Sequence, residues 1–377
     1  MEFSSYLLMG LITGALFGAV LHKVGAVRYS RVEGLLLLKD LKILKFAFVG
    51  VGTASILYGL AFLLGVNDAL NIHPRIMPYM GVAHILGGFL FGIAFAASGL
   101  CPGTCLARVG SGKWIAFAAV IGLMLGIVIY DLLYPFLVDA GILGNKKAIT
   151  IYGVFGLPYG VVAVLWGVLF MFLAYLANKR DPAVELEKNE PKPESFIDLL
   201  KNEWHWFPSG VLAGVIIVWA TMQGQFLGFS GSILSFVAWI AYELGHPLGV
   251  VPVIDETIMW RAGLAMGVIP GAFISSYLSR TLKFDVVPPS FAEAVSPIPW
   301  VRLSLVFFGG VFLALGAMIG GGCTTGAFLA AYPTLSVGSL LQSGTFFLVG
   351  VLTANLIYFG RWHQFLKSKP AADLLYD

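Results

Sequence analysis

The chain has 377 residues, of which 58% are hydrophobic and only 11% are charged, and its mean hydropathy is +0.88. A soluble domain carries about 25% charged residues, so the composition excludes a water-soluble globular protein and predicts a chain covered largely by membrane lipid. The formal net charge is only +3, and the absence of a basic stripe argues against a nucleic-acid partner.

The first apolar stretch lacks a basic segment before it and a small-residue cleavage site after it, so we interpret it as a retained membrane span. A spanning helix needs about 20 mostly apolar residues. A shorter apolar piece, 231–245, predicts a re-entrant segment. The predicted spans are 6–24, 44–65, 79–98, 115–137, 151–177, 207–224, 258–278, 302–319 and 336–359.

The polar segment 178–206 divides the chain, and we interpret it as a cytoplasmic linker with no function beyond joining. If it is cytoplasmic, the Lys and Arg residues of 23–43 and 108–114 also lie inside, which fits the positive-inside rule. This predicts an inner-membrane protein with its N-terminus outside and its C-terminus in the cytoplasm. Also assigned to the inside are Arg280, Lys283, Arg302, Arg361, Lys367 and Lys369, whereas Arg75, Lys146 and Lys147 remain outside.

Two segments match in kind, GGFLFGIAFAASGLC at 87–101 and GGVFLALGAMIGGGC at 309–323. Each is followed by a small-residue loop and another long span, so each half contributes four spans and 151–177 joins them. A single extra span inverts the second half, which is the plan of many transporters. Chance similarity between two glycine-rich spans is the alternative.

The predicted fold is therefore an all-α polytopic membrane protein with an inverted repeat and broken helices. The first repeat covers 1–137, the joining span and linker cover 138–206, and the second repeat covers 207–377.

The sequence LCPGTC predicts the first broken helix. Pro102 disfavours a helical conformation at Cys101 and is itself favoured as the first residue of a new helix, so Cys101 should be an N-cap. Cys105 follows one turn later on the same face. The free N–H groups of Gly103, Thr104 and Cys105 would then face an anion.

The sequence GGGCTTGAF predicts the second break, because its glycines let the backbone turn and approach an ion closely. Inversion would bring the two breaks face to face, with two helix N-termini converging on one point. The residues of this motif are Gly320, Gly321, Gly322, Cys323, Thr324 and Thr325.

The three cysteines all fall in these two motifs, and an odd number does not make a disulfide framework. Their alternative role is packing as small apolar side chains. For an anion conduit the thiols must stay neutral, so that each donates an S–H hydrogen bond.

Other polar residues are weaker candidates. We interpret His84 as a hydrogen-bonded interior histidine, Asp255 as an N-cap and Glu256 with Arg261 as an ion pair. Arg108 and Lys113 are interpreted as anchors at the inner membrane surface, with the attraction of anions as their alternative role. Nucleotide-binding and hydrolase motifs are missing, so we expect neither an enzyme nor an ATP-driven pump, and no metal or cofactor.

At these motifs the sequence resembles the YeeE/YedE family of sulfur-compound transporters. The resemblance is carried by LCPGTC after FGIAFAASG, by GGGCTTGAF before TLSVGSLL, and by FGAVLHKVGAVRYSRVEGLLLLKD at 17–40, and it covers nearly the whole chain outside 178–206. It implies an hourglass-shaped permease in which thiosulfate passes between the thiols of Cys101 and Cys323. Val27 stands where the family has an early cysteine, and Cys105 is an additional thiol.

The sequence thus predicts a permease that admits thiosulfate or a related sulfur anion near Cys323 and releases it near Cys101 and Cys105. A cytosolic sulfur-carrier protein is the candidate recipient. The alternatives are a channel for another small anion or selenium species, a thiol oxidoreductase using the C-x-x-x-C pair, and a structural membrane scaffold.

Overall fold

The computed structural model describes residues 2–144, 146–184, 196–282 and 287–357. These residues form helices and no named strand. Eight helices, α4 counted together with α5, are long and apolar enough to cross a bilayer, as predicted for a multi-pass membrane protein. The spanning helices are α1 (Glu2–Lys23), α3 (Lys42–Leu63), α4 (Val82–Ser98), α6 (Ile115–Asp139), α8 (Tyr159–Arg180), α13 (Glu256–Leu278), α15 (Pro299–Gly320) and α16 (Val337–Ile357).

Shorter helices connect the spans and form the interior. α11 has 17 residues, which is less than a full span, and the predicted re-entrant piece is the helix α12. The short elements are α2 (Tyr29–Leu36), α5 (Pro102–Gly110), α7 (Ile151–Val154), α10 (Phe196–Lys201), α11 (Trp206–Met222), α12 (Phe229–Glu243), α14 (Pro289–Ala294), η1 (Thr324–Ala330) and η2 (Tyr332–Thr334).

The predicted joining span 151–177 begins too early. A short helix, α7, ends at a turn in which Gly156 has φ +64°, and Pro158 then caps α8. Because proline favours an extended residue before it, the two helices cannot merge. Of the residues assigned to the cytoplasmic side, Lys283, Arg361, Lys367 and Lys369 lie outside the described part of the chain.

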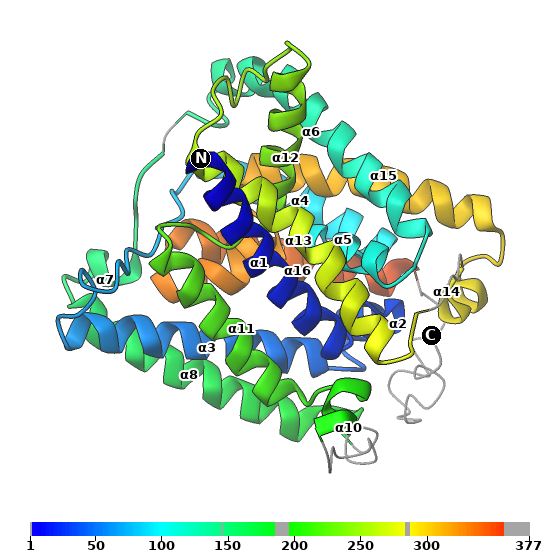
Figure 1. Ribbon diagram of the computed structural model, residues 1–377, viewed down its shortest axis with the longest axis horizontal. Helices are drawn as coiled ribbons and strands as arrows, with labels where there is room; N and C mark the ends of the chain where they lie inside the picture. Colours follow the sequence, from blue (N-terminus) through cyan, green and yellow to red (C-terminus); the bar gives the residue numbers. More distant parts are fainter. Residues whose placement is uncertain (1, 145, 185–195, 283–286, 358–377) are drawn as a thin grey trace.

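The central helix pair is α1 with α13, which run side by side through the middle of the molecule (Figure 1). Glycines at every fourth position let the backbones touch. A Cβ atom at Gly14 would lie 2.2 Å from the carbonyl oxygen of Leu264, and one at Gly267 would lie 2.1 Å from that of Leu11. Small residues at this spacing drive helix association in lipid, so close backbone packing holds α1 and α13 together.

Most helix pairs join the two halves of the chain. α1 packs on α13 and α11 on α3, while α4 packs on both α15 and α16 and α15 also packs on α6. Figure 1 shows α3 with α8 along one edge and α6 with α15 along the opposite edge. The inverted orientation of the halves, with boundaries at 137 and 206, stays a prediction.

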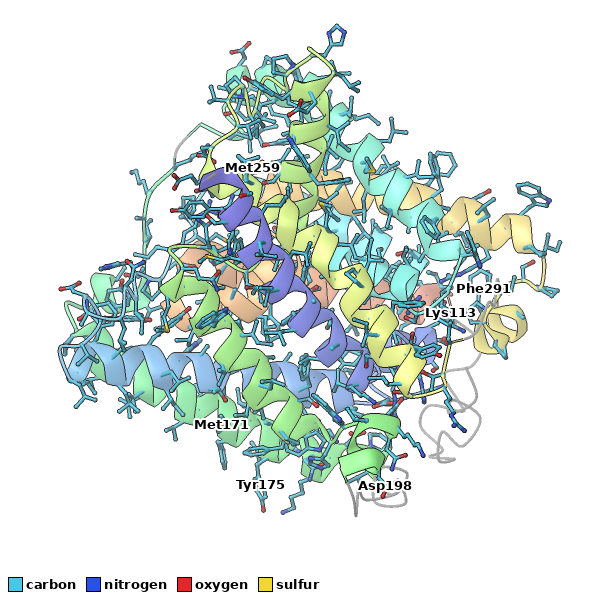
Figure 2. All side chains as sticks on the ribbon, in the orientation of Figure 1. Lys113, Met171, Tyr175, Asp198, Met259 and Phe291 are labelled. Atoms are coloured by element: carbon cyan, nitrogen blue, oxygen red, sulfur yellow. The ribbon has the colours of Figure 1, made fainter. Side chains whose placement is uncertain are left out.

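The outer surface is apolar. Exposed Leu, Phe and Val side chains cover α6, α8 and α15, and only small residues and Phe170 of α8 are buried. Figure 2 shows Tyr175 projecting outward from α8, with 61% of its surface exposed. Such a surface suits lipid rather than water.

Candidate functional site

The first helix break lies between α4 and α5, where the sequence predicted it. α4 ends at Gly99, whose φ of +62° is left-handed and suits glycine. Cys101 is extended, and Pro102 begins α5. The break therefore leaves Cys101 as the N-cap of a nine-residue helix.

Thr104 fixes the Cys101 thiol. The Thr104 hydroxyl accepts a 2.8 Å hydrogen bond from the Cys101 backbone N–H, and its oxygen lies 3.3 Å from the Cys101 sulfur. The sulfur in turn faces the backbone N–H of Thr104, which completes a capping box. The thiol is thus held at the positive end of the α5 dipole.

The second break lies between α15 and η1. Gly321 has φ +91°, Cys323 is the extended N-cap, and the short helix η1 that follows is a π-helix. The buried Gln342 side chain donates a 3.2 Å hydrogen bond to the carbonyl of Gly322. π-Helical turns are rare and occur often at functional sites.

The two breaks bring the predicted cysteines together. The Thr324 hydroxyl is hydrogen-bonded to the Cys101 thiol, and the Cys323 sulfur is close enough to interact electrostatically with that of Cys101. Cys101 is 7% exposed, whereas Cys105 and Cys323 are fully buried, and none forms a disulfide. Residues 222 positions apart in the chain therefore meet in the interior.

A cavity opens on one side of this meeting point. Its volume is about 680 Å³, including the open space at its mouth, and its polar lining consists of Cys101, Thr104, Thr324 and Thr325. The remaining wall is apolar, from α1, α2, α3, α4, η1 and α16. A cavity with a few convergent polar groups in an apolar wall is typical of a small-molecule site.

The predicted glycines support the breaks and do not line this cavity. A Cβ atom at Gly103 would lie 2.6 Å from the ring of Phe229, and one at Gly322 would lie 2.9 Å from the backbone nitrogen of Ala327. Gly103, Gly321 and Gly322 are therefore required for close packing and turning. Cys105 also lies outside the lining, one turn beyond Cys101.

Phe226 lies on the Gly326 side of η1, beside Cys323. A Cβ atom at Gly326 would lie 4.0 Å from the Cys323 sulfur and 3.8 Å from the Phe226 ring, and Arg75 lies over that ring at 5.5 Å. Burial lowers the pKa of Arg75. Sequence reasoning missed Phe226, because a single aromatic residue in an apolar chain gives no signal.

Arg75 also interacts electrostatically with Arg261. The expected ion pair between Glu256 and Arg261 is not present among the described residues, so that interpretation was wrong. Asp255 is the predicted N-cap and accepts a 2.8 Å hydrogen bond from the Ile258 N–H.

Each break is capped from the other half of the chain. His84 donates from Nδ1 to the carbonyl of Gly320 at 2.8 Å and accepts the Met80 N–H at Nε2, so both ring nitrogens are satisfied as expected. Arg302 donates to the carbonyl of Ser98 at 2.8 Å. These bonds satisfy carbonyls that a helix end otherwise leaves free.

Charged residues beside α2 and α3 tie the linker to the cavity side of the molecule. Glu203 pairs with Arg28 at 2.6 Å, with Lys42 at 3.2 Å and with Arg31 at 3.5 Å. Burial alone would raise the pKa of Glu203, but the three cations outweigh it and hold that pKa below its usual value. The linker is therefore anchored at this point.

Comparison with known proteins agrees with this architecture. A family model described as Sulphur transport matches residues 29–353. The chain is 25% identical to the thiosulfate transporter TsuA of Spirochaeta thermophila, over 93% of this chain and 99% of that protein. It is 23% identical to the thiosulfate transporter TsuA of Escherichia coli strain K12, over 95% and 96%. The chain therefore belongs to the Sulphur transport family, whose role is transport rather than catalysis.

Proposed function

We propose that this protein is an inner-membrane permease that takes up thiosulfate or a related sulfur anion. The observation that carries the proposal is the meeting of Cys101 and Cys323 at two broken helices beside a cavity. Two thiosulfate transporters that match the chain over nearly its full length support the choice of substrate.

The proposed path begins beside Phe226, where Arg75 attracts the anion to the outer mouth. The anion then passes the Cys323 thiol and reaches the Cys101 thiol and the Thr324 hydroxyl. From there it enters the cavity lined by Thr104 and Thr325 and leaves toward the cytoplasm. At each step a neutral S–H or O–H group donates a hydrogen bond to the anion.

Neutral donors suit transport because they bind the anion without trapping it. An anion entering an apolar interior loses its hydration, and fixed hydrogen-bond donors together with the positive end of α5 offset part of that cost. A permanent cation in direct contact at every step would hold the anion too firmly for release. A ladder of uncharged hydroxyl and thiol donors allows release at each step.

The proposed orientation places the N-terminus outside and the C-terminus in the cytoplasm, with the halves inverted. Reciprocal packing supports inversion, because α1 meets α13 as α11 meets α3, and α4 meets α16 as α15 meets α6. The cluster around Glu203 lies on the proposed cytoplasmic side, where the cargo would pass to a cytosolic sulfur-carrier protein.

Growth rescue tests the proposal. The gene is expressed in a bacterium that lacks sulfate and thiosulfate uptake, with thiosulfate as the sole sulfur source. We expect wild type to restore growth and both Cys101→Ala and Cys323→Ala to abolish it. Ser111→Ala is the matched control, since this buried hydroxyl at the end of α5 donates to the carbonyl of Ala107 in the same helix.

Three results separate the alternatives. Failure of well-expressed wild type to support growth removes the thiosulfate assignment. Full growth of both cysteine variants means that the thiols only pack. A mixed disulfide trapped between Cys101 or Cys105 and a partner protein favours the thiol oxidoreductase.

A further inference from the structure

Arg108 on α5 is a cation in an unusual environment. Its side chain is 2% exposed, and its Nε and Nη2 atoms have no hydrogen-bond partner. A buried charge without a partner is strongly destabilising. The predicted role as an anchor at the membrane surface is therefore wrong, because an anchor keeps its charge in water.

The groups that act on Arg108 do not neutralise it. Among the described residues they are a second arginine, Arg302, together with Cys105, Tyr29 and Cys101, and no carboxylate. Arg302 has its own fixed place: it donates to Ser98 and lies over the rings of Tyr29 and Phe291, at 4.4 and 4.6 Å from their centroids.

Two other buried cations of this protein have carboxylate partners. Lys45 pairs with Asp181 at 2.8 Å, and Arg31 pairs with Asp40 at 2.5 Å. Two further buried cations, Arg302 and Lys23, donate to backbone carbonyls instead. Arg108 differs from these residues, which points to a counter-ion that the chain itself does not provide.

The position of Arg108 identifies that counter-ion. Cys101, Cys105 and Arg108 follow one another at intervals of four and three residues, so they form one stripe along α5. An anion held by the Cys101 thiol would lie about two turns from Arg108, with Cys105 between them. The guanidinium therefore lies on the face that bears the proposed thiol site.

We propose that Arg108 is the buried counter-charge for the transported anion and binds it after it has moved from Cys101 along the α5 stripe, past Cys105. This inference rests on the proposed function and narrows its substrate class. A planar guanidinium with free N–H groups suits two oxygens of a sulfur oxyanion. A neutral sulfur compound or sulfide, which lacks those oxygens, would not use it.

The test uses the purified full-length protein in detergent, with thiosulfate binding measured by calorimetry. We expect Arg108→Gln to bind thiosulfate at least about tenfold more weakly, as expected for losing a charged hydrogen bond, with Arg108→Lys between it and wild type. Lys113→Gln, which removes a cation from the turn after α5, is the matched control and should bind like wild type.

Thermal unfolding without ligand separates binding from structure. We expect Arg108→Gln to unfold at the same temperature as wild type or higher, since it removes an unpaired buried charge, and to lose the stabilisation that thiosulfate gives. A large drop in the ligand-free unfolding temperature would assign Arg108 a structural role and overturn the inference.

Uptake distinguishes this inference from the proposed function. If wild type neither binds nor takes up thiosulfate, both fall. If wild type takes it up, Cys323→Ala does not, and Arg108→Gln binds and transports like wild type, only the role of Arg108 falls. Loss of binding in Arg108→Gln with an intact fold supports both.

Discussion

The two helix breaks have the same backbone plan, a left-handed glycine followed by an N-cap cysteine, but they differ in the helix and the side chains that follow. The α4–α5 break ends in a regular nine-residue α-helix that carries two cysteines and a buried arginine. The α15–η1 break ends in a seven-residue π-helix with one cysteine, preceded by three glycines and supported by Gln342. The first break carries a cation on its own short helix, whereas η1 carries none.

This difference predicts unequal occupancy of the two breaks. A neutral break with a single thiol passes an anion on, whereas a break with two thiols and a cation retains it longer. Equal breaks would give equal affinity from both sides. The asymmetry therefore favours accumulation of the anion on the α5 side of the barrier before release.

The largest predicted effect on stability comes from replacing the left-handed glycine at either break, Gly99 or Gly321, by alanine. A Cβ atom at Gly99 would lie 2.2 Å from the Tyr29 ring, whereas one at Gly321 would lie 2.8 Å from the flexible end of Met77. We expect Gly99→Ala to cost about 2–5 kcal/mol, from backbone strain and overpacking together, and Gly321→Ala about 1–2 kcal/mol. Thermal unfolding in detergent measures both, and equal losses would contradict the comparison.

The next effect concerns the caps. Arg302→Met removes a charged hydrogen bond worth about 1.5–3 kcal/mol and contacts with two rings, whereas His84→Phe removes two uncharged bonds worth about 0.5–1.5 kcal/mol each. We expect the Arg302 variant to be the less stable of the two by thermal unfolding. The reverse order would make the α15–η1 break the more dependent on its cap.

A smaller effect is expected at Cys105. This thiol is sealed from the cavity yet lies on the α5 stripe, so Cys105→Ala should slow thiosulfate uptake several-fold, less than Cys101→Ala. Initial uptake rates of the labelled anion in whole cells check this order. Wild-type rates in Cys105→Ala would confine the site to Cys101 and Cys323.

The smallest effect appears only in acid. The pKa of Glu203 is lower in the fold than in the unfolded chain, so its stabilisation is complete above the unfolded pKa, about 4.3, and is lost as pH falls through the folded pKa. Below the folded pKa of Glu203 we expect faster amide hydrogen exchange in residues 23–45 and 196–206. Residues 75–84, near the other break, should not respond, and Glu203→Gln should remove the pH dependence.

Much of the fold could be predicted because lipid imposes a length and a polarity on every span. The start of α8 could not, since the apolar residues before Pro158 read as part of the same span. Likewise the apolar stretch 207–224 was long enough to predict a span, although the helix it forms, α11, has only 17 residues and is shorter than the thickness of a bilayer. Hydropathy indicates which segments are apolar but does not locate the turns within them.

The site was predictable in its local part. The dipeptide Cys101–Pro102 fixes a helix start, and the glycines before Cys323 fix a turn. The contacts made by Gln342, Arg302 and Phe226 join distant segments and leave no local pattern. The sequence favoured the anchor role for Arg108, because an arginine seven residues after Cys101 looks the same in sequence whether it faces water or the interior.

The exchange of caps between the halves has a consequence for biogenesis. The carbonyl of Ser98 can gain its hydrogen bond only after Arg302, 204 residues later, has been synthesised. The bond between His84 and Gly320 likewise needs a residue synthesised 236 positions later. Since membrane insertion follows synthesis from the N-terminus, neither bend reaches its final shape until nearly the whole polypeptide has left the ribosome. A truncated product would insert into the bilayer without an assembled conduit. The membrane would therefore not leak anions while the protein is being synthesised.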